Sequence, residues 1–195
     1  MCPIVTRSML YCVMPSKTLV DSELITLGES CKLKLFSFRS KTLEYIMLHD
    51  DYCLFLKKKL IEYNISPDKI IDTIKELRNS IYFSKIELKI KFCLSDDSIT
   101  ILTQDKLLSF NPVDMKYEFT LPCAGNFVEL IGKGRLAIIN HLKHKNSNEV
   151  LESELISMKL RHCSLGIKYI LYDLIGSGKV QCIKCGMGNL LRLQS

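Results

Sequence analysis

The chain has 195 residues, of which 47% are hydrophobic, enough to build a core in a domain of ordinary size. Its 27 Lys and Arg exceed its 21 Asp and Glu, and the formal net charge of +6 favours an acidic or nucleic-acid partner only mildly. Nine cysteines at scattered spacings, with no secretory signal, argue against a disulfide scaffold, and no segment has the roughly 20 apolar residues that a membrane span needs. We therefore expect a soluble intracellular protein with reduced cysteines.

A hairpin and two helices are predicted first. Residues 32–35 and 43–47 alternate apolar and polar side chains on either side of a polar turn, which is the pattern of a β-hairpin. Asp50 and Asp51 are suited to begin a helix that we expect to end near Asn64, because carboxylates complement the exposed amides of a helix start. A second helix is expected to follow, over residues 67–81.

Residues 86–121 predict an antiparallel meander. Apolar and polar residues alternate through 86–92, 99–102, 107–110 and 115–121, and polar turns separate these runs. Successive side chains of a strand point to opposite faces, so one face of this sheet would be buried and the other wet. The predicted fold class is α+β, a mainly antiparallel sheet with helices packed on one face.

Two later segments fit either a helix or a strand. Asn126 and Glu129 match a capping box that would begin a helix over residues 127–139, but Gly132 and Gly134 weaken that interpretation. Residues 150–163 satisfy both periodicities, so both segments stay open at this point.

The chain is expected to end in a helix and a tail. Residues 167–174 carry a helical apolar stripe that stops at Gly176. No internal repeat or linker divides the sequence, so we predict a single domain over residues 1–195. Residues 1–20 are expected to be poorly ordered, and residues 176–195 are expected to fray.

The cysteine pair near the C-terminus is the sharpest chemical motif. Cys182 and Cys185 have the spacing at which two thiolates bind one tetrahedral zinc ion, and His141 and His144 could supply the other two ligands. The alternative function is therefore a small zinc-binding nucleic-acid-binding module. The main interpretation is a pair of unligated thiols, without a metal or a cofactor.

No catalytic motif has the spacing that its chemistry requires. Residues 176–179 lack the upstream glycine and the hydroxyl of a phosphate loop, because Asp173 and Val180 stand at those positions. The four histidines form no recognisable signature with a nucleophile. We predict no catalytic residue and no enzymatic activity.

Basic clusters are the candidate nucleic-acid contacts, because lysines can neutralise phosphates. They are Lys57, Lys58 and Lys59 in the first predicted helix, and Lys143 and Lys145 later in the chain.

The order of sheet and helices resembles the topoisomerase VI B-like subunits of the meiotic double-strand-break machinery, which keep a transducer-type domain without a working ATPase. The segments that carry the likeness are IELKIKF, SITIL, KYEFTL and GIKYILYDLIG. The resemblance implies a non-catalytic interaction subunit of a nuclear DNA-recombination complex, which supports meiotic double-strand-break formation by a partner cleaving subunit.

The resemblance also implies protein partners in a multisubunit complex, with DNA reached through that complex. It implies no membrane and no small-molecule substrate, and the cytoplasm is the alternative to a nuclear location. Ile167, Ile170, Leu171 and Leu174 would then form a docking stripe for a partner helix, and the alternative for these four residues is core packing.

Overall fold

The chain forms two compact units in a computed structural model that describes residues 4–37, 44–76, 82–121, 124–159 and 163–194. Unit 1 comprises residues 1–5 and 21–124, and unit 2 comprises residues 6–20 and 125–195. The stretch expected to be a single domain is thus divided between two units, and unit 2 combines two segments that are far apart in the sequence.

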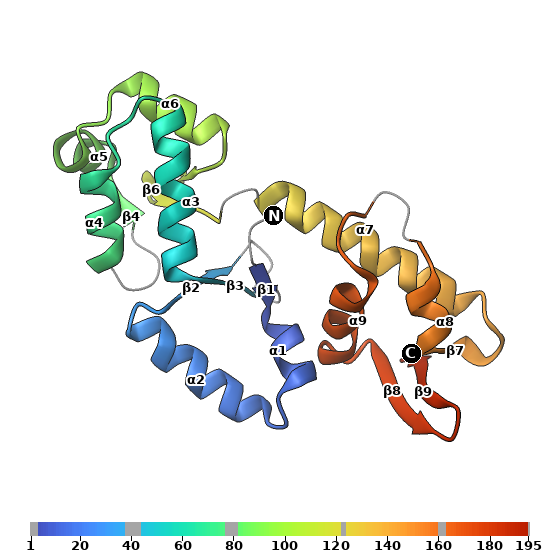
Figure 1. The fold of residues 1–195 in the computed structure, drawn as a ribbon. Coiled ribbons are helices and arrows are strands. Elements are labelled where there is room, and N and C mark those ends of the chain that lie inside the picture. The colour runs from blue at the N-terminus through green and yellow to red at the C-terminus, as the bar shows by residue number, and fades with distance from the viewer. Residues whose placement is uncertain (1–3, 38–43, 77–81, 122–123, 160–162, 195) are drawn as a thin grey trace. The chain divides into compact units, whose positions relative to one another are not determined.

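One order of elements occurs three times in the described residues (Figure 1). Each copy runs strand, helix, helix, strand, strand, and its last strand lies between the other two in a three-stranded sheet. We number these copies as repeats. Repeat 1 comprises β1 (Ile4–Thr6), α1 (Arg7–Val13), α2 (Lys17–Glu29), β2 (Leu33–Ser37) and β3 (Glu44–Leu48). Repeat 2 comprises β4 (Tyr82–Phe83), α5 (Lys85–Phe92), α6 (Asp96–Gln104), β5 (Leu108–Asn111) and β6 (Lys116–Phe119). Repeat 3 comprises β7 (Glu149–Leu151), α8 (Glu152–Ser157), α9 (Ile167–Gly176), β8 (Val180–Cys185) and β9 (Gly188–Leu193).

Three helices and a short turn connect the repeats. Between repeats 1 and 2 lie α3 (His49–Glu62) and α4 (Asp68–Glu76), and between repeats 2 and 3 lie α7 (Ala124–Lys143) and the 3-10 turn η1 (Asn146–Asn148). Among the described helices, none is long and apolar enough to cross a membrane.

The predicted α+β class is confirmed. The hairpin near the N-terminus is β2 paired antiparallel with β3, and the expected second half of the meander is β5 paired antiparallel with β6. The first predicted helix is α3, and the second is α4 as far as residue 76, since residues 77–81 lie outside the described part of the chain. Strands are distributed over three small sheets, however, and do not form one large one.

The strands predicted at residues 86–92 and 99–102 are wrong. Both segments are helical, and each helix follows a serine that acts as its N-cap. The Ser84 hydroxyl accepts from the Glu87 amide at 3.2 Å, and the Glu87 carboxylate accepts from the Ser84 amide at 2.7 Å. This capping box begins α5, in which Leu88 and Phe92, four residues apart, are buried. Ser95 caps α6 in the same way by accepting from the Ser98 amide at 3.0 Å.

The segments that the sequence left open are resolved. Residues 127–139 lie within α7, whereas the segment from residue 150 contains the end of β7 and then α8, with residues 160–162 outside the description. The tail after Gly176 does not fray but forms the antiparallel hairpin of β8 and β9. Residues 4–20 form β1, α1 and the first turn of α2, and residues 1–3 are outside the described range.

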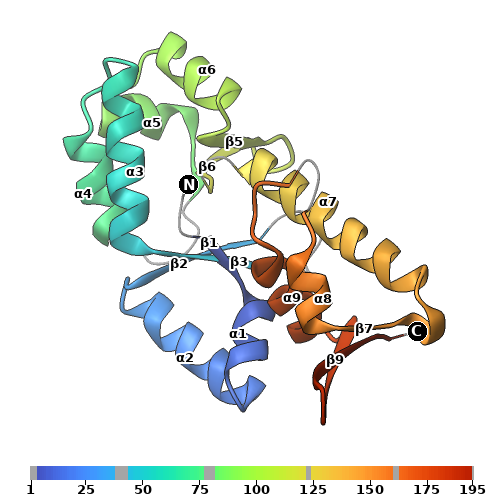
Figure 2. The same cartoon turned by 45° about the vertical axis from the view of Figure 1, so that its right-hand side comes forward.

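In unit 2, α1 packs alongside α9, as Figure 2 shows. Their backbones approach so closely at Gly176 that a Cβ atom there would lie 1.6 Å from the Ser8 carbonyl oxygen. A glycine is therefore required at this crossing.

We expect Gly176→Ala to lower the free energy of unfolding by about 1–3 kcal/mol, because the added methyl group forces α1 away from α9. Urea unfolding followed by circular dichroism measures this effect. Gly132→Ala is the matched control, since no atom lies within 4 Å of its added Cβ in α7. That control should be neutral or stabilising by up to about 1 kcal/mol. Equal losses in the two variants would contradict the close approach.

Candidate nucleic-acid interface

The net positive charge of the chain resides in unit 2. This unit contains 12 Lys and Arg against five Asp and Glu, whereas unit 1 contains 15 Lys and Arg against 16 Asp and Glu. Since phosphate groups are attracted by net positive charge on a surface, unit 2 is the part of the chain that is suited to nucleic acid.

The second helix of repeat 3, α9, presents a basic stripe. Lys168 and Tyr172 are exposed, and Lys179 is exposed in the turn that follows the helix. With 3.6 residues per turn, Lys168 and Tyr172 fall within about 40° of one another around the helix axis. Lys179 lies three residues beyond the end of α9, directly after Gly178 with its positive φ of 75°. The described part of the chain supplies no ion pair to either lysine. Both charges are available to a ligand.

A buried carboxylate anchors α9 in unit 2. Asp173 is fully buried, and its two oxygens accept from Thr6 Oγ1 at 2.7 Å and from Arg135 Nε at 2.5 Å. Thr6 caps α1, and Arg135 lies on α7, so one side chain ties three helices together. A buried charge is tolerated only when it is paired and hydrogen-bonded in this way.

The hairpin of β8 and β9 continues directly from α9. Lys184 and Met187 are exposed at its end, and Met187 retains 82% of its accessible surface. Leu191 of β9 is fully buried and holds the hairpin against the core. Repeat 3 thus combines an exposed basic helix with a projecting hairpin that carries one more lysine.

The second helix of repeat 2 has the opposite character. Asp96 and Asp97 occupy the first turn of α6, and this helix has no basic residue. Lys85 and Lys89 of α5 bind the Asp96 carboxylate at 2.8 and 2.7 Å. Carboxylates at the start of a helix occupy the position where a phosphate would otherwise bind, so α6 is unsuited to nucleic acid.

Lys168, Tyr172, Lys179 and Lys184 are not among the contacts predicted from the sequence. The helix over residues 167–176 was predicted, and its polar side could have been identified from the same periodicity that revealed its apolar side. Of the lysines that were predicted, Lys57, Lys58 and Lys59 lie on α3 in unit 1, whereas Lys143 and Lys145 lie at and just after the end of α7 in unit 2. These two clusters therefore belong to different units.

The predicted docking stripe packs in the core. Ile170, Leu171 and Leu174 are fully buried, and Ile167 is half-buried. Docking on these side chains is corrected to core packing, because the apolar side of α9 faces the interior of unit 2 and only its polar side reaches solvent.

The alternative zinc site does not assemble. His141, His144, Cys182 and Cys185 all lie in unit 2, but the described residues contain no cluster of three or more His, Cys, Asp or Glu side chains that could hold a metal ion. The Cys185 thiol donates to the Gly188 carbonyl at 3.0 Å within its own hairpin. Both cysteines of the pair are free thiols.

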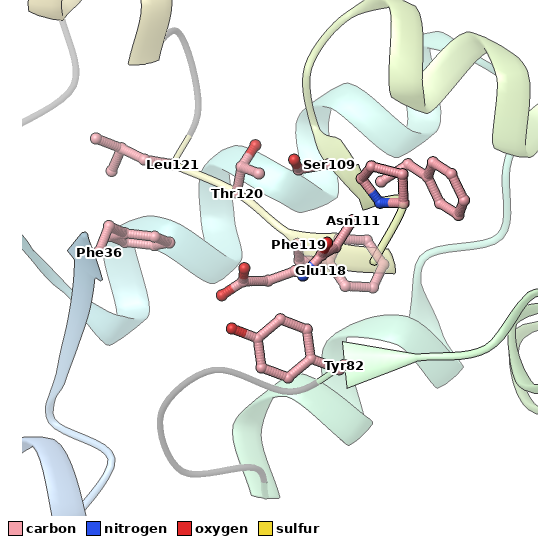
Figure 3. A pocket seen from close by; sticks show the side chains of 10 residues that line it. Phe36, Tyr82, Ser109, Asn111, Glu118, Phe119, Thr120 and Leu121 are labelled. Atoms are coloured by element: carbon pink, nitrogen blue, oxygen red, sulfur yellow. The ribbon is translucent and has the colours of Figure 1, made fainter. Parts of the chain in front are cut away.

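Unit 1 contains a cavity of about 360 Å³, shown in Figure 3. The Glu118 carboxylate and the Tyr82 hydroxyl lie close together in it, and Phe36 lies across from them. The negative charge of Glu118 raises the pKa of Tyr82. The described lining of this cavity includes neither histidine nor cysteine.

Comparisons with known proteins identify relatives over almost the whole chain. The chain is 27% identical over 195 residues to the human protein named winged helix repair factor 1. The aligned region covers 98% of this chain and 76% of the human protein. The Xenopus laevis protein of the same name is 27% identical over 201 residues, which covers 98% of this chain and 75% of the frog one. The Dictyostelium discoideum protein of that name is 30% identical over 97 residues, 50% of this chain and 25% of that one. No family model matches the chain.

We expect Asp173→Ala to lower the free energy of unfolding by about 3–5 kcal/mol, because it leaves the largely buried Arg135 without its charge partner. Chemical denaturation gives the value. Glu129→Ala is the control on α7, since it breaks the exposed pair with Lys133 and should change stability by less than about 1 kcal/mol. A similar small effect in both variants would show that the buried carboxylate does not anchor α9.

A second prediction concerns Asp96. Hydrogen bonds from Lys85 and then Lys89 lower its pKa from 3.8 to about 2. Because the folded-state pKa is depressed, this interaction stabilises the fold above about pH 4 and is lost as the pH falls toward about 2. In the double variant Lys85→Ala, Lys89→Ala, a carboxyl-detected NMR titration should find the pKa back near 3.8. An unchanged pKa in the variant would contradict the two ion pairs.

Proposed function

We propose that this chain is a non-catalytic DNA-binding subunit of the nuclear DNA-repair machinery, and that unit 2 makes the DNA contact through α9 and the hairpin of β8 and β9. The observation that carries the proposal is the exposed basic stripe of α9 in the unit that holds the excess positive charge. α9 is the second of the two helices of repeat 3 and follows α8 after residues 158–166, and helix-turn-helix proteins place the second of two helices in the major groove.

The stripe has the chemistry of such a contact. Lys168 lies in the first turn of α9 and Lys179 in the turn that follows the helix, with Tyr172 between them in the sequence, so each exposed ammonium can contact a phosphate. The one acidic side chain of α9, Asp173, is fully buried and paired, so it does not repel the phosphates. Lys184 on the hairpin of β8 and β9 can contact the DNA sugar-phosphate backbone beside the major groove.

The names of the relatives support repair as the process and the nucleus as the location, because they describe a winged-helix repair factor. The subunit role in meiotic double-strand-break formation, which the topoisomerase VI B-like resemblance implies, stays a prediction. The absence of enzymatic activity is likewise a prediction, which is supported by the lack of a catalytic signature in the sequence.

We expect the double variant Lys168→Ala, Lys179→Ala to bind duplex DNA more weakly by roughly tenfold per lysine at 0.1 M salt, and equally so on unrelated sequences, because each lysine releases one counterion. The slope of log affinity against log salt should fall in magnitude by about 2. Fluorescence anisotropy with two unrelated 20-base-pair duplexes, each at several salt concentrations, measures both quantities.

The matched control removes the same charge from unit 1. Lys32→Ala with Lys116→Ala also deletes two exposed lysines, and its DNA affinity should stay within about twofold of wild type. The proposal fails if the unit 2 variant binds as well as wild type, or if the unit 1 variant loses as much affinity.

A further inference from the structure

Helix α3 of unit 1 carries an exposed stripe that the DNA contact does not use. Leu54 and Ile61 each keep 55% of their accessible surface, and Lys57 and Lys58 between them are exposed. On a helix of 3.6 residues per turn these four positions fall within about 100° of arc, so they form one continuous surface two turns long. We call it the α3 stripe.

The opposite side of α3 already supplies the core. Tyr52, Leu56 and Leu60 are at most 2% exposed. Core packing therefore explains those residues, whereas Leu54 and Ile61 keep more than half of their surface exposed. Aliphatic side chains at this helical spacing are those through which an amphipathic partner helix is bound.

The two lysines of the stripe are available for pairing. Neither Lys57 nor Lys58 has an ion pair among the described residues, whereas their neighbour Lys59 binds Glu62 at 2.6 Å. The acidic Asp50 lies one turn before Leu54, in the first turn of the helix, where it complements the exposed amides. The centre of the stripe is therefore basic and its flanks are aliphatic.

We propose that the α3 stripe binds an acidic amphipathic helix of a partner protein. Such a helix offers Asp and Glu to Lys57 and Lys58, and aliphatic side chains three or four residues apart to Leu54 and Ile61. DNA supplies the phosphates but not the apolar surface, and the near-neutral charge of unit 1 does not favour DNA. This inference is independent of the DNA contact in unit 2.

The test uses the full chain and a display library of random 20-residue peptides. Binders are selected on wild type, then measured on two double variants, Leu54→Ser with Ile61→Ser and Lys57→Ser with Lys58→Ser. We expect a class of peptides that loses at least tenfold in affinity with each variant, and that is rich in Asp and Glu with aliphatic residues at helical spacing. The proposal is overturned if no selected peptide depends on both pairs, or if the dependent peptides are not acidic.

A matched control and a DNA measurement separate the alternatives. Lys32→Ser with Lys116→Ser removes two exposed lysines of unit 1 outside the stripe and should leave peptide binding unchanged. Circular dichroism melting of every variant confirms that the fold is kept, as expected for exposed positions. Duplex DNA should bind both stripe variants as well as wild type. If Lys57→Ser with Lys58→Ser weakens DNA binding while the aliphatic pair has no effect, the stripe is a nucleic-acid contact and the proposal fails.

Discussion

The buried carboxylate of Asp173 is the interaction on which the arrangement of unit 2 depends. It lies in the middle of α9, where an unpaired charge would be intolerable, and it is satisfied by Thr6 from the N-terminal segment and Arg135 from α7. Three helices must be in place at once for this carboxylate to be paired. The glycine contact at Gly176 adds a second condition, because it sets how closely α1 approaches α9. Together these two features fix one side of α9 inside the unit and leave the side with Lys168 and Tyr172 in solvent.

The distribution of charge gives the repeats different surfaces although their order of elements is the same. In repeat 3 the second helix buries its one acidic residue and exposes its one lysine, Lys168, whereas in repeat 2 the second helix begins with Asp96 and Asp97 and contains no basic residue. The ion pairs of Asp96 with Lys85 and Lys89 neutralise part of that charge within the repeat itself. One topology therefore carries an exposed lysine on the second helix in one copy and carboxylates at the start of that helix in another, and the exposed side chains, not the backbone, determine the ligand.

Most of the individual elements could be predicted, and the failures have specific causes. The β2–β3 hairpin, α3, α4 and α9 follow from periodicity and capping, which are local properties. The strand prediction for residues 86–92 is wrong because Ile86 and Ile90 are apolar yet exposed. Together with Leu88 and Phe92 they produce the alternation typical of a strand, although Ile86 and Ile90 do not pack in a core. The pairs Ser84 with Glu87 and Ser95 with Ser98 indicate the helices better than the apolar pattern indicates strands. A serine that can act as an N-cap marks a helix start independently of that pattern. A related reason applies to α9, because its apolar periodicity marks Ile170, Leu171 and Leu174, which the core buries, whereas the exposed residues lie on its polar side.

By itself the sequence determined the α+β class, the net charge, the local elements that have strong caps or stripes, and the lack of a recognisable catalytic signature. No repeat is recognisable in the sequence itself. The three structural repeats have in common their order of elements and their strand order, which residue identities do not reveal. Only the tertiary structure decided that the chain is divided into two units, that Asp173 finds partners 167 residues upstream and 38 residues upstream, and that the excess charge lies in unit 2. The physical reason is that caps and periodicity act over one or two turns, whereas burial of a charge and the sorting of lysines onto one surface depend on which distant segments pack together.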